Sequence, residues 1–596
     1  MRSLVTVLLV LLCGHGNRTL VSPPASASES LVDANSARLQ TLFRSEWERV
    51  LKEHPDYASE LGDRRYNTRW PDVSLPAMQA ADRASAEALT ELRSINFESL
   101  NALDRLNYRL FQRQYETEIA ERKYRLYLMP LSQRGGIQDQ NRLTDLLKFE
   151  TIRDYEDWIA RLNAFPAYLA QTMALMGQGI REGMLHPKVV MQRVPNQIRK
   201  QIVSQPQDSL FFKPFRSFVV ELTDAQKQRL RTQAATAIQE RVIPSYRAFL
   251  EFFEQQYLPA SYDHAGCWQR PNGQEMYRHL AKRYTTTDLT PQQIHEIGLC
   301  EVARIRKQME VIQKQVAFEG SFREFLTYLR TDRQFYYSTP DELLAAYREC
   351  CNRIDPQLPQ LFIHLPQTGY QIVPVPTQMA ADTTTAYYQP PSYDGRRPGT
   401  YYVNLYRIET RPKFEIEALS LHESVPGHHL QTALAMEVKS MPNFRRYGGQ
   451  TAFIEGWALY SEKLGEEMGF YQDPYSRFGQ LTYEMWRAVR LVVDTGMHSL
   501  KWSRQQAIDF FAANTAKSLL DIENEVDRYI AWPGQALAYK IGELRFTELR
   551  KRSEATLGDH FDVREFHDIV LRNGAVPLDI LEEQVDAWLA EKATTE

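Results

Sequence analysis

The chain lacks the features that mark a disulfide scaffold, a nucleic-acid-binding protein or a membrane protein. Only five cysteines occur in 596 residues, too few for a disulfide scaffold. The formal net charge is −4, and no motif of a nucleic-acid-binding fold is present, so we expect no nucleic acid partner. No apolar run reaches the length that spans a membrane, so we expect no transmembrane span in the mature chain.

The first residues have the pattern of a secretory signal peptide. Arg2 precedes an apolar run, residues 4–12, that is too short to cross a bilayer, and Ala25-Ser26-Ala27 is a small-x-small cleavage signature. We therefore predict a signal peptide over 1–27 and a secreted or periplasmic mature protein. Cys13 does not favour a lipid anchor, because Leu12 stands where lipoprotein signals carry a small residue.

Four cysteines remain in the mature chain: Cys267, Cys300, Cys350 and Cys351. Their spacing matches no zinc ribbon. Two interpretations stay open, namely one disulfide within this set or buried free thiols.

Most of the chain has helical periodicity, with apolar residues three and four positions apart. Thr290-Pro291 and Thr339-Pro340 are helix starts, each with a capping residue followed by proline. The length allows two to four domains, and prolines and glycines interrupt the pattern near 258–290. We predict an N-terminal helical region, 28–260, and a catalytic region, 261–596, with two helical lobes around a cleft. Helices are predicted at 35–54, 76–95, 100–124, 155–183, 223–257, 290–317, 340–353, 413–425, 449–469, 476–500, 503–519 and 535–553.

One stretch departs from this pattern. Residues 361–365, 370–375 and 400–406 are rich in β-branched and aromatic side chains and are bounded by proline and glycine. We predict a mainly α protein with one small β-sheet, which lies beside the active site.

The strongest chemical signal is a run of histidines next to a glutamate. A helix with the pattern H-E-x-x-H presents two histidines, four residues apart, to one metal ion, with the glutamate as general base. Here the second histidine comes six or seven residues after the first, which points it about 120° away or about 10 Å along a straight helix. The run is His422-Glu423-Ser424-Val425-Pro426-Gly427-His428-His429.

Proline and glycine offer a way to close the site. Pro426 cannot donate the helical hydrogen bond, and Gly427 tolerates unusual backbone angles. We predict that the helix bulges by two residues and then resumes, which returns His428 to the face of His422; His429 is the alternative ligand. Ordinary surface or core histidines are the competing interpretation. The clustering of three of the 13 histidines within eight positions argues against it.

A third ligand is expected on a downstream helix. Glu455 lies among apolar residues 27 positions after His428, and a carboxylate there is costly unless it is paired or binds a metal. Glu462 is seven residues further on the same face and could orient a ligand histidine, or it could be a solvated helix residue. The predicted cofactor is one catalytic zinc ion.

Several motifs together resemble the bacterial domain-of-unknown-function family 885, a group similar to gluzincin metallopeptidases. The Gly427-His428 and Phe453-Ile454-Glu455 segments are also similar to those of thimet-oligopeptidase-type enzymes. The resemblance implies a zincin-like helical fold with a channel. The matching segments are residues 61–67, 397–404, 422–429, 455–460, 494–498 and 528–540.

Chemistry and resemblance together suggest roles for further residues. Glu423 would take a proton from the attacking water, and Tyr539 or His498 would stabilise the oxyanion. Arg528 and Lys540 could hold a substrate carboxylate. Residues 399–405, with Tyr401 and Asn404, could pair with a peptide by strand addition. A packed tyrosine, a helix-end histidine and a purely structural strand are the alternatives.

The predicted function is zinc-dependent hydrolysis of peptide bonds in oligopeptides, as an exopeptidase or oligopeptidase. Two alternatives remain: a zinc amidase or esterase acting on a non-peptide bond, and a non-catalytic peptide-binding protein. Glu423 argues against the last, because a binding protein needs no general base.

Overall fold

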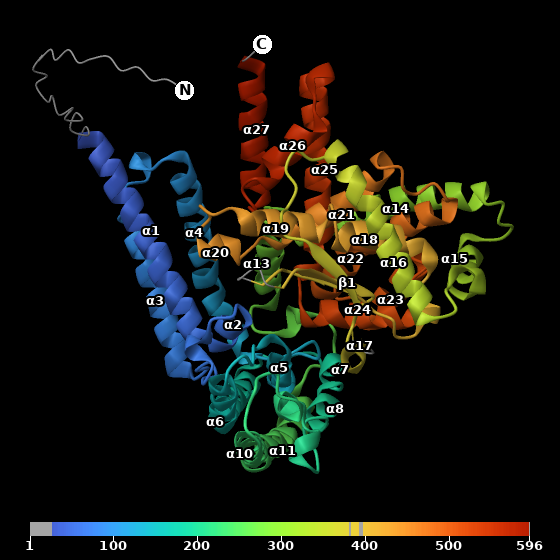
Figure 1. Cartoon of the computed structure of the whole chain (residues 1–596). Helices are drawn as coiled ribbons and strands as arrows, with labels where there is room; N and C mark the ends of the chain where they lie inside the picture. Colours follow the sequence, from blue (N-terminus) through green and yellow to red (C-terminus); the bar gives the residue numbers. More distant parts are fainter. Residues whose placement is uncertain (1–26, 381–382, 393–396, 595–596) are drawn as a thin grey trace, which may run out of the picture.

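A computed structural model describes residues 27–594 apart from 381–382 and 393–396. Within these ranges the chain is mainly helical with one small sheet, as predicted (Figure 1). The predicted signal peptide, except Ala27, and Cys13 lie outside the described residues. None of the described helices is both long enough and apolar enough to cross a membrane.

The N-terminal part is built from helices alone. In Figure 1, α1, α3 and α4 stand together as a blue group, and α6, α10 and α11 lie below the rest of the molecule. The helices are α1 (Ala27–Glu53), α2 (Pro55–Glu60), α3 (Leu75–Arg93), α4 (Ala102–Glu121), α5 (Leu143–Leu146), α6 (Ile152–Glu182), α7 (Lys188–Met191), α8 (Val194–Arg199), α9 (Lys213–Arg216), α10 (Asp224–Ala237), α11 (Ile243–Phe252) and α12 (Leu258–Ala260).

The C-terminal part contains the remaining helices. The predicted starts are confirmed, because the side chains of Thr290 and Thr339 cap α14 and α16. The helices are α13 (Gly273–Thr285), α14 (Pro291–Gln315), α15 (Phe322–Thr331), α16 (Pro340–Ile354), α17 (Thr377–Ala380), α18 (Ile416–Glu423), α19 (His428–Glu437), α20 (Asn443–Arg446), α21 (Thr451–Glu467), α22 (Pro474–His498), α23 (Arg504–Asn514), α24 (Leu519–Ala531), α25 (Ala538–Leu557), α26 (Val563–Leu571) and α27 (Leu578–Thr594).

The sheet has three strands, β1 (Tyr370–Pro374), β2 (Ala386–Gln389) and β3 (Gly399–Val403), in the order β1-β3-β2. β3 is parallel to β1 and antiparallel to β2. The predicted strand at 361–365 is wrong. Leu361 and Phe362 are neighbours and both are buried, so the segment lacks the alternation of a half-buried strand.

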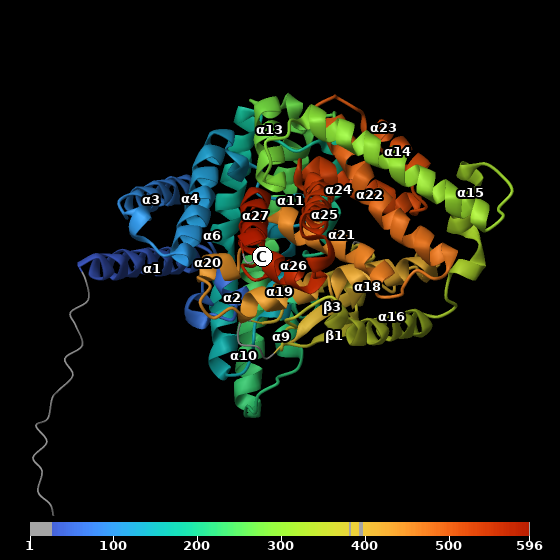
Figure 2. The same cartoon turned by 90° about the horizontal axis from the view of Figure 1, so that it is seen from above.

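Two helix pairs form the centre of the C-terminal part, α14 with α22 and α21 with α25. A Cβ atom on Gly456 of α21 would lie 2.5 Å from the backbone of Gly542 in α25, so glycine is needed for this close approach. Helix α18 lies between α22 and α16 (Figure 2) and also packs against β2. The segment that carries the histidines is therefore held on several sides.

The hydrophobic core continues across residue 260. One cluster of buried side chains runs from Trp70 to Leu589 and includes residues on both sides of the predicted boundary. The four cysteines at 267, 300, 350 and 351 are free thiols, and only Cys300 is exposed. Of the two interpretations left open, free thiols hold for the described residues.

Candidate metal centre

The histidine segment is two helices with a sharp break between them. Helix α18 ends at Glu423, the Val425–Pro426 peptide is cis, and α19 begins at His428. Gly427 lies against the end of α18, where a Cβ atom would be 2.0 Å from the carbonyl oxygen of His422. The helix does resume, but the predicted two-residue bulge is wrong in form, because residues 424–427 separate one helix from the next.

The break nevertheless brings His428 to His422. The centroids of the two rings lie 4.8 Å apart, at an interplanar angle of 85°. Glu455 of α21 completes the group: its Oε2 is 3.9 Å from Nε2 of His422 and 3.5 Å from Nε2 of His428. One ligand atom from each residue lies within 4.8 Å of the others, so the three side chains could hold one metal ion.

Glu462 contacts His422 on the side of the ring that faces away from the cluster. Nδ1 of His422 donates to Oε1 of Glu462 at 2.8 Å, which leaves Nε2 to face the cluster. Glu462 is fully buried, and burial raises its pKa to about 8 against the lowering effect of Arg487. Of the two interpretations of Glu462, the structure supports the orienting one.

Glu423 is buried beside the cluster, at the last position of α18. Burial raises its pKa to about 7; His428 lowers it, and the nearby Glu455 raises it further. The backbone amide of Tyr388 in β2 also faces the carboxylate through a hydrogen bond. A carboxylate that gains and loses a proton near neutral pH suits a general base.

His429 lies outside the cluster, and both of its nitrogens are engaged. Nδ1 accepts a hydrogen bond from the Tyr388 hydroxyl at 2.9 Å, and Nε2 donates to the carbonyl of Thr368 at 3.0 Å. A Cβ atom on Gly399 would lie 2.5 Å from the His429 ring, so a glycine is required where the strand passes. His429 therefore positions Tyr388 of β2 next to the cluster.

Tyr539 and Arg528 are two further predicted residues that the structure brings to the site. Burial raises the pKa of Glu455, but contacts with His428, Arg490 and the Tyr539 hydroxyl lower it below its usual value. The same hydroxyl interacts with the guanidinium of Arg528. Tyr539 and Arg528 thus lie at the edge of the cluster, on α25 and α24.

Two other predicted residues serve the core. His498 is fully buried, with Nδ1 accepting from the amide of Cys267 at 3.1 Å and Nε2 donating to the carbonyl of Tyr529 at 3.0 Å. It has no free nitrogen to offer an oxyanion. Lys540 is fully buried between Glu484 and Glu543, at 2.8 and 2.6 Å, so it is not available to a substrate carboxylate.

The predicted peptide-binding strand is also internal. β3 is paired on both sides, so the prediction that residues 399–405 add a peptide strand is wrong. Tyr401 is fully buried against Tyr347, and Asn404 donates to the carbonyls of Ala380, Thr383 and Thr384. Within the described part of the sheet, the strand edge next to Glu423 is that of β2.

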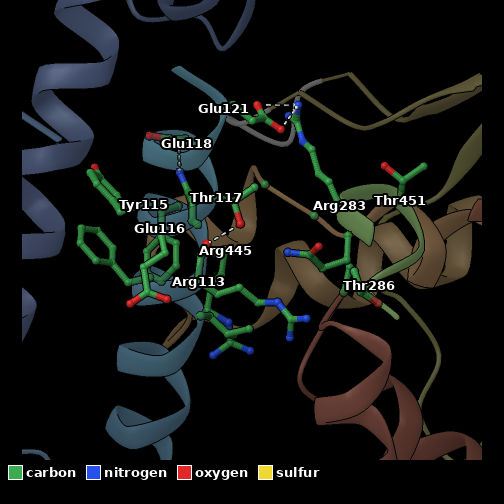
Figure 3. A pocket seen from close by; sticks show the side chains of 18 of the residues that line it. Arg113, Tyr115, Glu116, Thr117, Glu118, Glu121, Arg283, Thr286, Arg445 and Thr451 are labelled. Carbon is green, nitrogen blue, oxygen red and sulfur yellow. Dashed lines mark hydrogen bonds and ion pairs between the residues drawn. The ribbon is translucent and has the colours of Figure 1, made fainter. Parts of the chain in front are cut away.

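A cavity of about 690 Å³ lies between α4, α13, α20 and the start of α21 (Figure 3). Charges of both signs line it, among them the ion pair of Glu121 with Arg283. Thr451 lines the cavity at the first position of α21, and Glu455 is one turn further along the same helix face. The residues of the cluster itself, His422, His428 and Glu455, do not line this cavity.

Sequence reasoning missed the arginines around the site. Arg487 and Arg490 of α22 are buried near Glu462 and Glu455, and Arg134 comes from the N-terminal part. The signal in the sequence was weak: two arginines three residues apart in the otherwise apolar stretch 485–493.

A family model described as bacterial protein of unknown function (DUF885) matches residues 55–585. Among proteins with curated descriptions, none matches. A candidate lipoprotein from Colwellia psychrerythraea, solved as a crystal structure, is 29% identical with a TM-score of 0.89, covering 94% of this chain and 99% of that one. The structure of a candidate lipoprotein of unknown function from Shewanella oneidensis has the same fold, at 16% identity and a TM-score of 0.70, covering 92% and 99%.

Proposed function

The chain belongs to the DUF885 family of bacterial proteins, and we propose that it is a zinc-dependent peptidase. The observation that carries the proposal is the meeting of His422, His428 and Glu455 within 4.8 Å, with the buried carboxylate of Glu423 beside them. Two histidines and a glutamate leave a tetrahedral zinc ion one open position, as catalytic zinc sites require.

The contact between Glu462 and the proposed ligand His422 is consistent with a zinc ion. Glu462 fixes the tautomer of His422, and a carboxylate behind a ligand histidine is a recurrent feature of zinc sites. When bound, zinc would supply the Lewis acidity that polarises the scissile carbonyl and acidifies water.

The chain's own residues would supply the proton transfers and orientation. Glu423 would take a proton from the attacking water and return it to the leaving amine, because its buried carboxylate lies beside the ligands. The Tyr539 hydroxyl, at the edge of the cluster, would donate to the oxygen on which negative charge develops. We assign no such role to His498.

The substrate would lie between the cavity and the sheet. A volume of about 690 Å³ is within the range of ligand sites and accommodates several residues of a peptide. The edge of β2, next to Glu423, could pair with an extended peptide backbone, in the role first predicted for residues 399–405.

We also propose that the protein is exported. The pattern of residues 1–27 supports export, as does the description of the two related structures as candidate lipoproteins. Mass spectrometry of the mature N-terminus distinguishes cleavage after Ala27 from lipid attachment at Cys13. An intact Met1 would exclude both.

The test of peptidase activity combines metal analysis with a mixed peptide library and small amide and ester substrates. The zinc-loaded protein is expected to cleave peptides. Its activity should be lost on addition of a chelator and restored on addition of zinc. Glu423→Gln should keep one equivalent of zinc and lose about 10²-fold or more in rate, because it removes the base and leaves the ligands.

The matched control is Glu466→Gln, which changes an exposed glutamate paired with Arg477 on the same helix as Glu455. It should behave as wild type. Near wild-type turnover by Glu423→Gln would refute the general-base role, and cleavage of only the small substrates would favour an amidase or esterase.

A further inference from the structure

Two buried arginines converge on Tyr539 at the edge of the metal cluster. The guanidinium carbon of Arg490, on α22, lies 4.0 Å from the centre of the Tyr539 ring, and that of Arg528, on α24, lies 5.9 Å from it. The Tyr539 hydroxyl contacts Arg528 on one side and Glu455 on the other. An anion held by these arginines would therefore lie next to a metal ligand.

The two buried arginines have a common acidic partner, which lies on the same helix as Arg528. Glu525 is the carboxylate that both arginines share, at 3.0 Å from Arg490 and 3.2 Å from Arg528. Nη2 of Arg528 makes the contact with Glu525, whereas Nη1 of Arg490 and Nε of Arg528 are buried and have no hydrogen-bond partner among the described residues. Both side chains are more than nine-tenths buried, where an unsatisfied charged donor is costly.

A third arginine comes from the N-terminal part of the chain. Arg134 is exposed and lines a small cavity with Trp486 and Glu525, and its charge acts on Glu525 and Arg528. The amide of its neighbour Gln133 donates to the carbonyl of Asp527 at 2.9 Å, which fixes the loop against α24. Three guanidinium groups thus surround one carboxylate.

We propose that Arg134, Arg490 and Arg528 form a subsite for a carboxylate group of the substrate, beside the metal centre. Guanidinium groups bind carboxylates through paired, charge-assisted hydrogen bonds, which would use the unpartnered donors. The carboxylate could be the free C-terminus of a peptide or an aspartate or glutamate side chain near the scissile bond. The inference rests on the proposed peptidase function.

The experiment compares three forms of each peptide that the zinc-loaded protein cleaves: the free acid, the C-terminal amide, and the amide with an aspartate next to the scissile bond. The kcat/KM for the free acid is expected to exceed that for the plain amide at least about tenfold, because one hydrogen bond to a charged group contributes about that much. If the aspartate restores cleavage of the amide, the carboxylate comes from a side chain. Equal cleavage of all three forms would overturn the subsite and leave the peptidase proposal intact.

A binding measurement separates the two proposals. Calorimetry with Glu423→Gln and the same peptides should show tighter binding of the carboxylate-bearing forms. Such a preference without turnover by the wild-type protein would refute the peptidase and keep the subsite. No binding of any form to Glu423→Gln, together with no turnover by wild type, would refute both.

Arg134→Gln tests the subsite with little risk to the fold, because the side chain is exposed. It should reduce the ratio of free-acid to amide kcat/KM severalfold, because only the free acid carries the carboxylate that Arg134 would bind. Arg181→Gln, an exposed arginine at the end of α6, is the matched control and should leave the ratio unchanged. An unchanged ratio in Arg134→Gln would remove Arg134 from the subsite.

Discussion

At the scale of single residues, the neighbours His428 and His429 have different roles. His428 faces His422 and Glu455, whereas both nitrogens of His429 bind Tyr388 and Thr368. We expect His428→Ala to lose zinc after dialysis, because one histidine and one glutamate are too few ligands. His429→Ala should keep the metal and lose part of the rate, because Tyr388 is no longer held.

Zinc analysis of the two purified variants decides this assignment, with circular dichroism as the check that both are folded. Retention of one equivalent of zinc by His428→Ala would contradict the role of His428. Loss of zinc from His429→Ala alone would transfer the ligand role to that residue.

Residues whose role depends on their own helix could be predicted, and those defined by distant partners could not. Glu455 was found because a carboxylate among apolar residues needs a partner, and Glu462 because it lies seven residues further on the same helix face. Lys540 has a similarly apolar setting, but its partners Glu484 and Glu543 use its charge within the core. The sequence offers no means of distinguishing a buried ion pair from a binding residue, because the partner comes from another helix.

At the scale of elements, the break between α18 and α19 shows how far local reasoning reaches. Pro426 and Gly427 predicted a disturbance of the helix, and the return of His428 toward His422 followed from the need for a second ligand. The form of the disturbance could not be predicted, since the path depends on contacts such as that of Trp457, which donates to the carbonyl of Pro426.

The pair α21 and α25 carries Glu455 and Tyr539, so its spacing should control the site. Gly456→Ala would place a Cβ atom 2.5 Å from Gly542, and we expect the helices to separate. The expected cost is about 1–3 kcal/mol of stability, seen as a lower melting temperature, with a loss of activity.

Gly177→Ala in α6 is the control for the helix propensity of alanine. Its Cβ atom would meet nothing closer than Arg181, at 3.8 Å, so we expect a neutral or slightly stabilising effect. Equal melting temperatures for both variants would contradict the close-packing argument.

At the scale of the whole molecule, helix positions were predictable but their arrangement was not. Periodicity gave most of the long helices, including α14, α21 and α22, because amphipathic patterns are local. The order β1-β3-β2 is set by pairing between separate segments, so the central position of β3 had no local signal. Arg134 lies in the predicted N-terminal region, 28–260, which the chain length suggested was separate from the catalytic region. It nevertheless reaches the site, because one hydrophobic core spans both regions.

Asp494 is a second point at which separate parts of the molecule meet. It is fully buried in α22, where it accepts a hydrogen bond from Tyr277 of α13 at 2.6 Å and from the amide of Gly534 at 3.1 Å. Burial raises its pKa to about 7, against the lowering effect of these hydrogen bonds. An unfolded aspartate has a pKa of about 3.9, so between these values the folded state binds the extra proton.

The stability that Asp494 contributes should therefore fall as the pH rises from about 4 to about 7, by an amount on the order of 4 kcal/mol.

Asparagine keeps an acceptor for Tyr277 and does not titrate. We expect the melting temperature of Asp494→Asn, relative to wild type, to rise between pH 5 and pH 7 and to level off above about pH 7 in calorimetry. Asp509→Asn, which changes an exposed residue of α23, should show no such trend. A difference between Asp494→Asn and wild type that does not vary with pH would mean that Asp494 is ionised throughout, and that Tyr277 and Gly534 compensate fully for its burial.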